Sequence, residues 1–321
     1  GCRDACTRAV PCAARCQARR RACHMSGNLQ SLRRKIDGAR DLQGVVRSMK
    51  ALAASSIGQY EKAVRSLDDY RRTVELGLAV ALRAGVVAPL AAEKKAETRS
   101  IGAIVLGSDQ GLVGGFNEVL ADFVSGTLNA LPGKIKKIWA VGERIQSLMT
   151  DIDPARTVAL PAPTSVHGIT ALVGQLLIDI QAAHERGEVE DILVFYNHPK
   201  SDAVYEQVSR QLLPLDRKWG NAFVALPWPS NNVPQLIGPA TSTLQAFIRE
   251  YLFVVLFQAC AESLASENGS RLAAMQRAEK NIQGMLETLN GSFHRLRQES
   301  IDEELFDVIA GYEALAGKSS P

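Results

Sequence analysis

Two long helical patterns, one toward each end of the chain, constrain its fold more than any other feature. No proline occurs between Pro11 and Pro89, and from Leu29 onward positions three and four apart repeat for roughly seven heptads. A second proline-free pattern runs from Ser242 to Leu315. At about 1.5 Å per residue, the two patterns correspond to helices of roughly 90 and 100 Å, longer than a compact domain needs. We therefore predict that the two helices pair as an antiparallel coiled coil within the chain.

The seam of the first helix is imperfect, because Gln43, Lys50 and Arg71 fall on positions that apolar residues normally occupy. Such a seam is typical of a helix whose partner is not an identical helix. The predicted seam positions are Leu29, Leu32, Ile36, Ala39, Gln43, Val46, Lys50, Ala53, Ile57, Tyr60, Val64, Leu67, Arg71, Val74 and Leu78. The predicted apolar face of the second helix comprises Leu244, Phe247, Tyr251, Val254, Val255, Ala261, Leu264, Leu272, Met275, Ile282, Leu289, Phe293, Leu296, Ile301, Leu305 and Val308.

The middle of the chain, residues 99–227, has a different pattern. Short strand-like runs at 100–108, 136–142, 155–160 and 191–199 alternate with helical stretches at 116–130, 142–150, 168–186 and 202–213. Alternating strands and helices predict a small, mostly parallel sheet with helices on its faces. The fold class is thus α/β plus a long antiparallel coiled coil. The expected segments are an N-terminal helix at 26–90, the α/β domain at 99–227, a linker at 228–241, a C-terminal helix at 242–315 and a tail at 316–321.

Residues 1–25 stand apart by composition. They hold five of the six cysteines and six arginines but almost no large apolar residues, so they cannot bury a helix face. Three interpretations remain: a metal-binding arm, an arginine-rich organelle presequence, or a disordered extension foreign to the mature protein. Met25, directly before the helical pattern, favours the third.

Composition excludes some functions. The formal net charge of +3 is too small, and its basic residues too dispersed, to indicate a nucleic-acid partner. The longest apolar run, 251–261, is too short to span a bilayer, so we predict no direct membrane insertion.

The glycine-rich stretch "SDQGLVGGFN" (108–117) follows a strand-like run, where α/β proteins often hold a phosphate. It lacks the lysine and hydroxyl of a P-loop, and Gly111, Gly114 and Gly115 do not match the dinucleotide fingerprint. We interpret these glycines as a strand-to-helix turn, and expect no cofactor. The histidines have no metal-ligand spacing and no nucleophile motif is present, so no catalytic or metal-binding residue is predicted.

A basic stretch in the first helix leaves two interpretations open. Arg33, Arg34 and Lys35 lie beside the predicted seam, and further basic residues follow on later turns. They form either a solvated helix face or a docking surface for acidic loops of a partner.

Several motifs, in order along residues 28–315, resemble those of the γ subunit family of F-type ATP synthases. The segment "NLQSLRRKIDGARDLQGVVRSMKALAASSI" (28–57) is similar to that family's N-terminal helix, and "SDQGLVGGFN" to its Ser-Asp-Arg-Gly-Leu-Cys-Gly-Gly signature. "VFYNHPKSDAVYEQVSRQLLPL", "ESLASENGSRLAAMQRAEKN" and "FHRLRQESIDEELFDVIAGYEAL" resemble later segments.

The resemblance implies two long coiled helices, an inserted Rossmann-like domain and a non-catalytic role as the central rotor stalk. Its expected partners are the α and β subunits of F1, the ε subunit and the c-ring of F0, with ATP bound by those neighbours. It further implies a peripheral position on the cytoplasmic face of a bacterial membrane, or on the matrix side of the mitochondrial inner membrane.

The resemblance also assigns contacts with the α3β3 ring. Met49 and Lys50 match the family's Met-Lys pair near acidic loops of the catalytic subunits, and Arg297 and Gln298 match its Arg-Gln pair. The basic pair Arg33 and Arg34, with Asp302, completes the predicted set, and residues 305–315 correspond to the tip in the ring's apolar bearing.

Three positions depart from the family pattern. Gln110 and Val113 replace an arginine and a cysteine, and Asp302 stands where threonine is usual. These differences indicate a divergent branch, such as an alternative F-type ATPase that moves sodium ions. Two rival hypotheses remain: a coiled-coil scaffold with an α/β appendage, which predicts a homodimer, and a nucleotide-binding enzyme, which predicts nucleotide binding by the isolated chain.

Overall fold

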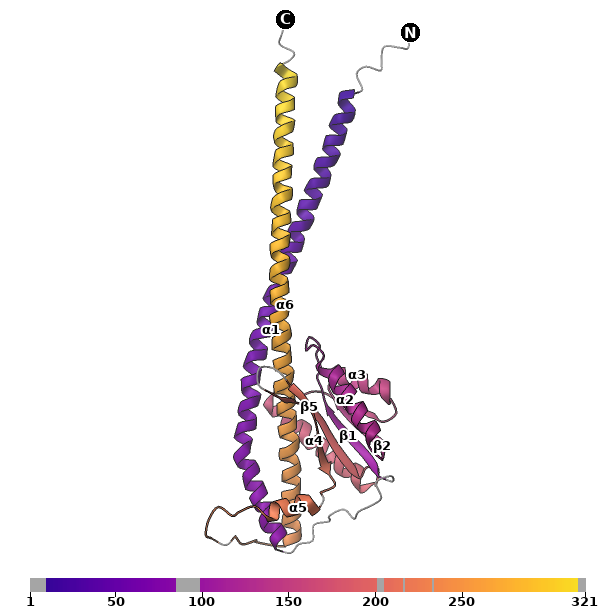
Figure 1. The fold of residues 1–321 in the computed structure, drawn as a ribbon, viewed down its shortest axis with the longest axis vertical. Coiled ribbons are helices and arrows are strands. Elements are labelled where there is room, and N and C mark those ends of the chain that lie inside the picture. The colour runs from indigo at the N-terminus through magenta and orange to yellow at the C-terminus, as the bar shows by residue number, and fades with distance from the viewer. Residues whose placement is uncertain (1–9, 85–98, 201–204, 216, 233, 317–321) are drawn as a thin grey trace. The chain divides into compact units, whose positions relative to one another are not determined.

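The structure is a computed structural model that describes residues 10–84, 99–200, 205–215, 217–232 and 234–316. The chain divides into two compact units, which are described separately. The first unit combines Gly1–Met49 with Met275–Pro321, and the second is Lys50–Ala274. Two helices run through both units: α1 spans Val10–Arg83 and α6 spans Ala240–Ala316 (Figure 1).

In the first unit, α1 and α6 pair in an antiparallel register. Arg47 Nε donates to Glu279 Oε1 at 2.9 Å, and Gln43 Nε2 donates to Gln283 Oε1 at 3.2 Å. The Arg33 guanidinium lies 5.9 Å from the centre of the Phe293 ring. As the residue number falls along α1, it rises by the same amount along α6. The predicted antiparallel coiled coil is therefore confirmed, with a constant register from Arg33 to Arg47 of α1.

The burial pattern confirms the predicted seam on α1, because every seam position from Leu29 to Leu78 is at least partly buried. The last three positions predicted for the apolar face of α6 are wrong, since Ile301, Leu305 and Val308 are 54%, 56% and 69% exposed. Figure 1 shows α1 and α6 diverging toward their free ends, so this end of α6 is not covered by its partner helix.

The start of α1 also differs from expectation, because the helix begins at Val10 rather than at residue 26. The structure therefore describes residues 10–25 as helix, whereas the sequence predicted a disordered extension. Alanine and arginine, which dominate this stretch, are strong helix formers, and Pro11 lies in the first turn, where proline is tolerated. Residues 1–9 lie outside the described residues, and whether 1–25 belong to the mature protein stays a prediction.

The second unit contains a five-stranded sheet in the order β3-β2-β1-β4-β5. Neighbouring strands among the first four are parallel, whereas β5 pairs antiparallel with β4. The bounds are β1 Ser100–Leu106, β2 Lys134–Val141, β3 Thr157–Leu160, β4 Asp191–Pro199 and β5 Tyr205–Leu213. The predicted mostly parallel sheet is confirmed.

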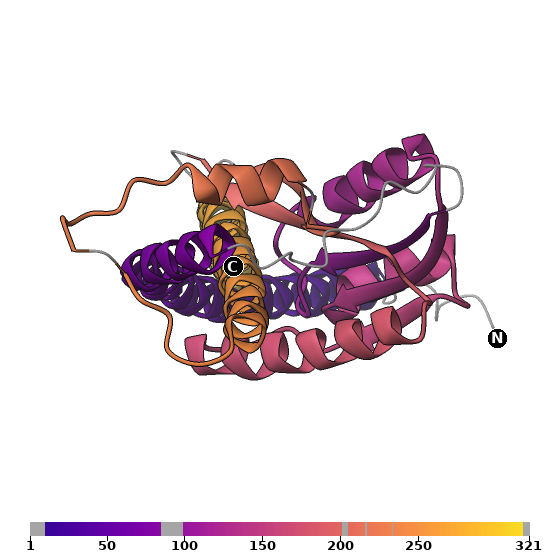
Figure 2. The same ribbon diagram turned by 90° about the horizontal axis from the view of Figure 1, so that it is seen from below.

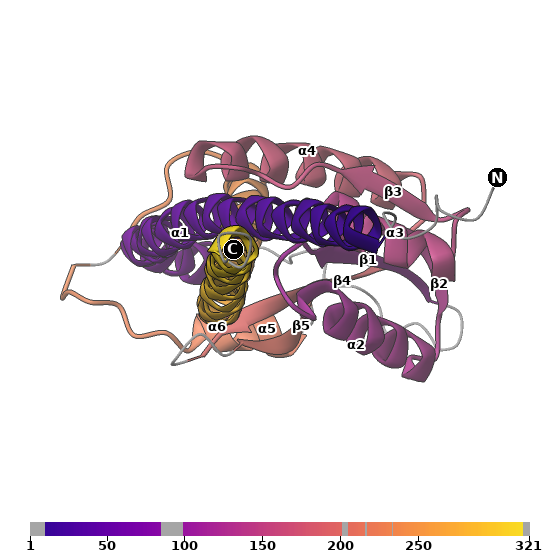
Figure 3. The ribbon, with the colours of Figure 1, turned by 90° about the horizontal axis from the view of Figure 1, so that it is seen from above.

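The two faces of the sheet bury separate apolar clusters. One cluster joins alternate sheet residues such as Ala103 and Val105 to helices α2 (Phe116–Ala130) and α3 (Glu143–Ile152). The other joins the intervening residues to α4 (Val166–Glu185) and to the buried part of α6 around Val255–Ala265. Figures 2 and 3 show α2 and α4 on opposite faces of the sheet. Alternate residues of each strand thus face different helices, as the two-residue period of a strand requires.

The helix predicted at 202–213 is wrong, because the described part of this segment forms strand β5. Gln, Leu and Arg give the segment good helix propensity. The segment nevertheless forms a strand, because its backbone N–H and C=O groups pair with those of β4 at the edge of the sheet. A short helix, α5 (Arg217–Val224), then follows Pro214 and was not predicted.

Two helices, α4 and α6, are long and apolar enough to cross a membrane by length and composition alone. In the structure, many of their apolar residues are buried in the core of the second unit. Ile169, Val173 and Leu176 of α4 and Val254, Leu256 and Ala261 of α6 are buried. This use of the apolar residues agrees with the interpretation of 251–261 as a buried helix segment.

Candidate functional site

The carboxyl edge of the sheet is where open parallel sheets normally bind ligands, at the point where the strand order reverses. Here the order reverses between β1 and β4, because the chain runs from β1 outward to β3 and then returns to the other side of β1. The loop 107–115, with its glycine-rich stretch, follows β1 at this edge.

Helix α6 covers this edge through a row of serines. Ser263 Oγ donates to the Leu106 carbonyl at 3.0 Å and Ser266 Oγ to the Asn197 carbonyl at 2.9 Å. One turn further, Ser270 Oγ donates to the carbonyl of Val113 in the loop at 2.5 Å. The carbonyl that ends β1 and one carbonyl near the end of β4 therefore accept hydrogen bonds from the chain's own helix. The place where a related sheet would hold a nucleotide is filled by α6.

The glycine-rich loop turns sharply from β1 to α2. Gly114 has φ 62°, a left-handed conformation that glycine adopts without strain. Leu112 has φ 63°, which is unusual for a branched residue, and its side chain is 61% exposed. Gly111 lies against Arg144, and Gly115 is the N-cap residue of α2. The sequence did not indicate the exposed, left-handed Leu112.

Behind this loop lies a small ionic cluster that the sequence also did not indicate. Asp109 Oδ1 accepts hydrogen bonds from the backbone N–H groups of Glu143 (3.0 Å) and Ala162 (3.1 Å). On α6, Arg271 Nη2 donates to Glu267 Oε1 at 2.6 Å, and both side chains are nearly buried. Burial raises the pKa of the Glu267 carboxyl, the Arg271 charge opposes this, and the Asp109 carboxylate adds to the rise. A cavity of about 160 Å³ lies between these groups.

A second ionic contact joins β4 to α6. His198 Nδ1 lies 2.9 Å from Glu262 Oε2, and Gln258 Nε2 donates to Glu262 Oε1 at 2.8 Å. Burial, and then the Glu262 charge, raise the pKa of Tyr196 to about 12. Among the described residues, no group of three or more His, Cys, Asp and Glu side chains could hold a metal ion. His198 thus contacts Glu262 of α6 from β4.

The predicted partner-contact residues fall into two groups. Arg297, Gln298 and Asp302 are exposed on α6, and Arg33 and Arg34 are exposed on the facing stretch of α1. The register brings Arg33, over Phe293, within one turn of Arg297.

Met49 and Lys50 form the second group and are half-buried on α1. By the register, Met49 lies roughly 30 Å along the coiled coil from the position that faces Arg297. The structure therefore does not bring all seven residues into one site.

The end of α6 exposes an unusual amount of apolar surface. These side chains, spaced three and four residues apart, cover more than one face of the helix, and α1 and α6 diverge toward their free ends (Figure 1). A contiguous exposed apolar patch of this kind marks an interaction surface. Its members are Ile301, Leu305, Phe306, Val308, Ile309 and Tyr312, which are 45–73% exposed.

Helix α1 also carries an exposed apolar stripe, which the predicted seam does not include. Leu42, Val45 and Leu52 are 53%, 56% and 68% exposed, and with Met49 they recur three and four residues apart. They therefore share one helix face, distinct from the seam. The signal in the sequence is the spacing of three and four residues between these apolar side chains, one position before each of the seam residues Gln43, Val46, Lys50 and Ala53.

The chain is similar to known proteins over nearly its whole length. A family model described as ATP synthase matches residues 28–315. An ATP synthase gamma chain of Anaeromyxobacter dehalogenans strain 2CP-C is 29% identical over 301 residues, covering 90% of this chain and 99% of that protein. An ATP synthase gamma chain of Polynucleobacter asymbioticus is 24% identical over 290 residues, covering 89% and 99%.

Solved structures share the fold. A chain from the Euglena gracilis mitochondrial ATP synthase, in a structure of OSCP, F1 and the c-ring, superposes with a TM-score of 0.62 at 15% identity. The match covers 92% of this chain and 97% of that one. A chain from the central stalk and c-ring of the Tetrahymena thermophila mitochondrial enzyme gives a TM-score of 0.51 at 19% identity, covering 73% and 99%.

Proposed function

This chain belongs to the ATP synthase family as a gamma-type subunit of its central stalk, and from that premise we propose how it acts. It turns inside a ring of three α and three β subunits, and its asymmetric coiled coil drives the catalytic sites through successive conformations. Ion flow is thereby coupled to ATP synthesis or hydrolysis.

One observation carries this proposal: the coiled coil ends in the exposed apolar segment 301–312 of α6. An apolar surface makes few directional hydrogen bonds, so a helix that carries it can rotate in an apolar collar with little resistance. The exposed side chains lie on several faces of the helix, which suits contact with a collar that surrounds it.

We further propose that the chain performs no bond-making step itself. In support, α6 packs over the carboxyl edge of the sheet through three serine hydrogen bonds, and so occupies the place where a nucleotide would lie. ATP is accordingly bound by the neighbouring subunits.

The contact residues follow from the two groups on the coiled coil. Arg297, Gln298 and Asp302, with Arg33 and Arg34, form one polar contact with the ring close to the apolar end. Met49 and Lys50 form a second contact with the ring, beside the exposed apolar residues Leu42, Val45 and Leu52 of the same helix. Polar side chains that are exposed on a helix can form and break hydrogen bonds during rotation at small cost, because water replaces the lost partner.

At its other end the stalk contacts the ε subunit, as the family resemblance implies, and the c-ring, in support of which the Tetrahymena structure of similar fold is one of a central stalk and c-ring. The chain is thus a peripheral component, held at the membrane by its partners. The similar gamma chains are bacterial, which favours the cytoplasmic face of a bacterial membrane.

Reconstitution tests this function. Purified α and β subunits mixed with this chain should form an α3β3γ complex that hydrolyses ATP, whereas the isolated chain should neither bind ATP nor hydrolyse it. If the three kinds of subunit do not assemble into this complex, the rotor proposal is refuted. A stable homodimer would point to the scaffold alternative, and ATP binding by the isolated chain to the enzyme alternative.

A further inference from the structure

Three serines of α6 reach from the coiled coil to three separate segments of the α/β domain. Ser263, Ser266 and Ser270 are spaced three and four residues apart, so they share one helix face and span about 10 Å along its axis. All three are buried, with exposures of 3%, 4% and 8%. Their acceptors belong to the end of β1, to β4 and to the loop between β1 and α2. These three contacts are called the serine row below.

The central acceptor of the serine row is itself held in place. Asn197, whose carbonyl accepts from Ser266, donates through Nδ2 to the Phe116 carbonyl of α2 at 3.2 Å. Gln207 of β5 donates to Asn197 Oδ1 at 3.1 Å, and Asn197 is completely buried. A buried polar network whose members all have partners favours one arrangement, because moving one member leaves others unpaired in a medium of low dielectric constant.

The loop after β1 is braced in the same way. Asn117 Oδ1 accepts from the backbone N–H of Ser108 at 3.0 Å, and Asn117 Nδ2 donates to Ser108 Oγ at 2.9 Å. Ser108 Oγ in turn donates to the Gln110 carbonyl at 3.0 Å. These bonds join the loop to the start of α2. The Leu106 and Val113 carbonyls, on either side of this braced stretch, are therefore presented to α6 in fixed positions.

Apolar contact alone would not fix how α6 is turned against the sheet. Beside the serine row, α6 buries Val255, Leu256, Ala261 and Leu264 in the cluster that it shares with the sheet and α4. Such burial is favourable but non-directional, so by itself it sets no single angle of the helix. A hydrogen bond, in contrast, is lost once its donor and acceptor move apart by about 1 Å. Three such bonds, to acceptors on three segments, therefore oppose both sliding and turning of α6.

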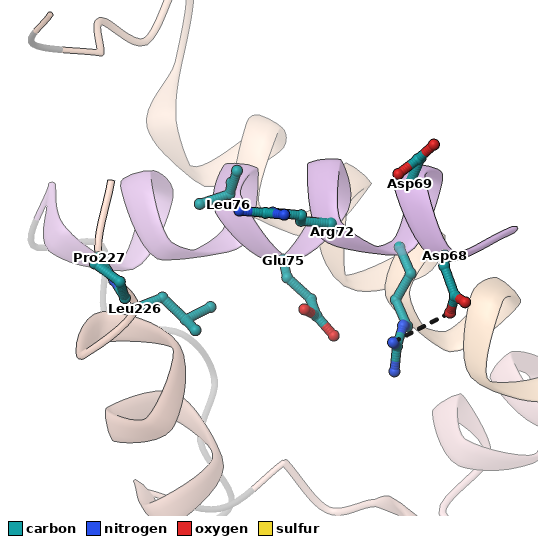
Figure 4. Close-up of a pocket in the computed structure, with 8 residues that line it drawn as sticks. Asp68, Asp69, Arg72, Glu75, Leu76, Leu226 and Pro227 are labelled. Atoms are coloured by element: carbon teal, nitrogen blue, oxygen red, sulfur yellow. Dashed lines mark hydrogen bonds and ion pairs between the residues drawn. The ribbon is translucent and has the colours of Figure 1, made fainter. Parts of the chain in front are cut away.

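Polar side chains of α1 provide a contrast. A cavity of about 530 Å³ between α1 and the segment after α5 is lined by Asp68, Asp69, Glu75 and their neighbours. Asp68 forms an ion pair within its own helix, and Figure 4 shows Asp69 and Glu75 directed away from one another. Ser66 of α1 likewise donates to the Lys62 carbonyl of its own helix at 2.8 Å. Because this bond stays within one helix, Ser66 is a matched control for the serine row.

We propose, resting on the proposed rotor function, that rotation passes between the coiled coil and the α/β domain through the serine row. A shaft that turns a second body needs a contact that resists sideways force without slipping, and directional bonds at three points supply one. Ser266 is the central positioning residue, because its acceptor Asn197 is held by both α2 and β5.

Two markers, observed on the assembled complex with the α3β3 ring fixed to a surface, test this proposal. One is attached to the domain through Ile178→Cys on α4, and the other to the shaft through Gln245→Cys, an exposed position near the start of α6. With the native serines, both markers should show the same angular spread at each dwell. When Ser263→Ala, Ser266→Ala and Ser270→Ala are combined, the mean-square spread of the domain marker should rise about twofold or more, because three directional contacts are lost. The shaft marker should be unchanged, and Ser66→Ala should change neither marker.

Circular dichroism checks that the triple variant is folded. If it is not, Ser266→Ala alone is measured in the same way and should also widen the spread of the domain marker only. The proposal is overturned if the domain marker of the folded variant spreads no more than with the native serines. It is also overturned if both markers widen equally, because the serines would then only stabilise the shaft as a whole. Failure of the rotor function gives a different result, in which neither marker rotates even with the native serines.

Discussion

At Gly77 on α1 the packing of the two long helices leaves almost no room for a side chain. A Cβ at this position would lie 2.3, 2.4 and 2.9 Å from three ring atoms of Phe247 on α6. The ring packs against a buried cluster that includes Val74, Leu78 and Leu244, so it has little freedom to move away. Gly77→Ala therefore forces an overlap between α1 and α6.

The size of the effect follows from two opposing contributions. Alanine gains about 1 kcal/mol over glycine in a helix interior, whereas overpacking a core costs about 1–3 kcal/mol. Gly77→Ala should thus lower the free energy of unfolding by up to about 2 kcal/mol. Gly58 on the same helix is the matched control, because nothing lies within 4 Å of a Cβ there. Gly58→Ala should raise the free energy of unfolding by about 0.5–1 kcal/mol.

Denaturant unfolding at low protein concentration, followed by circular dichroism, measures both variants. Adding Phe247→Leu to Gly77→Ala removes the ring, so the double variant should be destabilised less than the sum of the two single changes. The close packing of Phe247 against Gly77 is refuted if Gly77→Ala stabilises the chain as much as Gly58→Ala.

Three further predictions concern the core, the sheet edge and the helix end. Burial raises the pKa of the Cys260 thiol from 9.0 to about 12, so at pH 8 iodoacetamide should label it on the order of a thousandfold more slowly in the folded than in the unfolded chain; equal rates would contradict its burial. Since this folded pKa lies above the unfolded value, the stability linked to Cys260 is fully present below pH 9 and falls as the pH rises toward 12. Ser266→Ala leaves the buried Asn197 carbonyl without its 2.9 Å hydrogen bond and should cost about 1–3 kcal/mol in the same unfolding assay, unless that bond is absent in solution. Leu305→Asp should change the free energy of unfolding by less than about 0.5 kcal/mol, because the side chain is 56% exposed, yet reduce ATPase activity of the assembled complex; undiminished activity would count against the bearing role of this segment.

The coiled coil and most of the sheet could be predicted from the sequence, because their signals are local and periodic. The α1 seam repeats every few residues from Leu29 to Leu78, so single exceptions such as Lys50 do not obscure it. Strand β4 is a short apolar run bounded by polar residues, and its predicted limits agree with the structure.

The remaining features depend on contacts between distant residues. Strand β5 has the composition of a helix and becomes a strand because β4 offers an unpaired edge. The cavity between Asp109 and Glu267 brings together residues far apart in the chain, and no spacing rule relates them. Leu305 is exposed because α1 and α6 diverge toward their free ends (Figure 1), which periodicity along α6 alone does not reveal.

Rotation is the property that separates a rotor stalk from every alternative considered. A marker can be attached to the α/β domain through Ile178→Cys on α4, where the native side chain is 65% exposed, in a chain whose N-terminal cysteines are changed to serine. With the α3β3 ring fixed to a surface, addition of ATP should drive stepwise rotation of this marker in one direction. A ring that hydrolyses ATP at the normal rate while the marker stays still would contradict the proposed function.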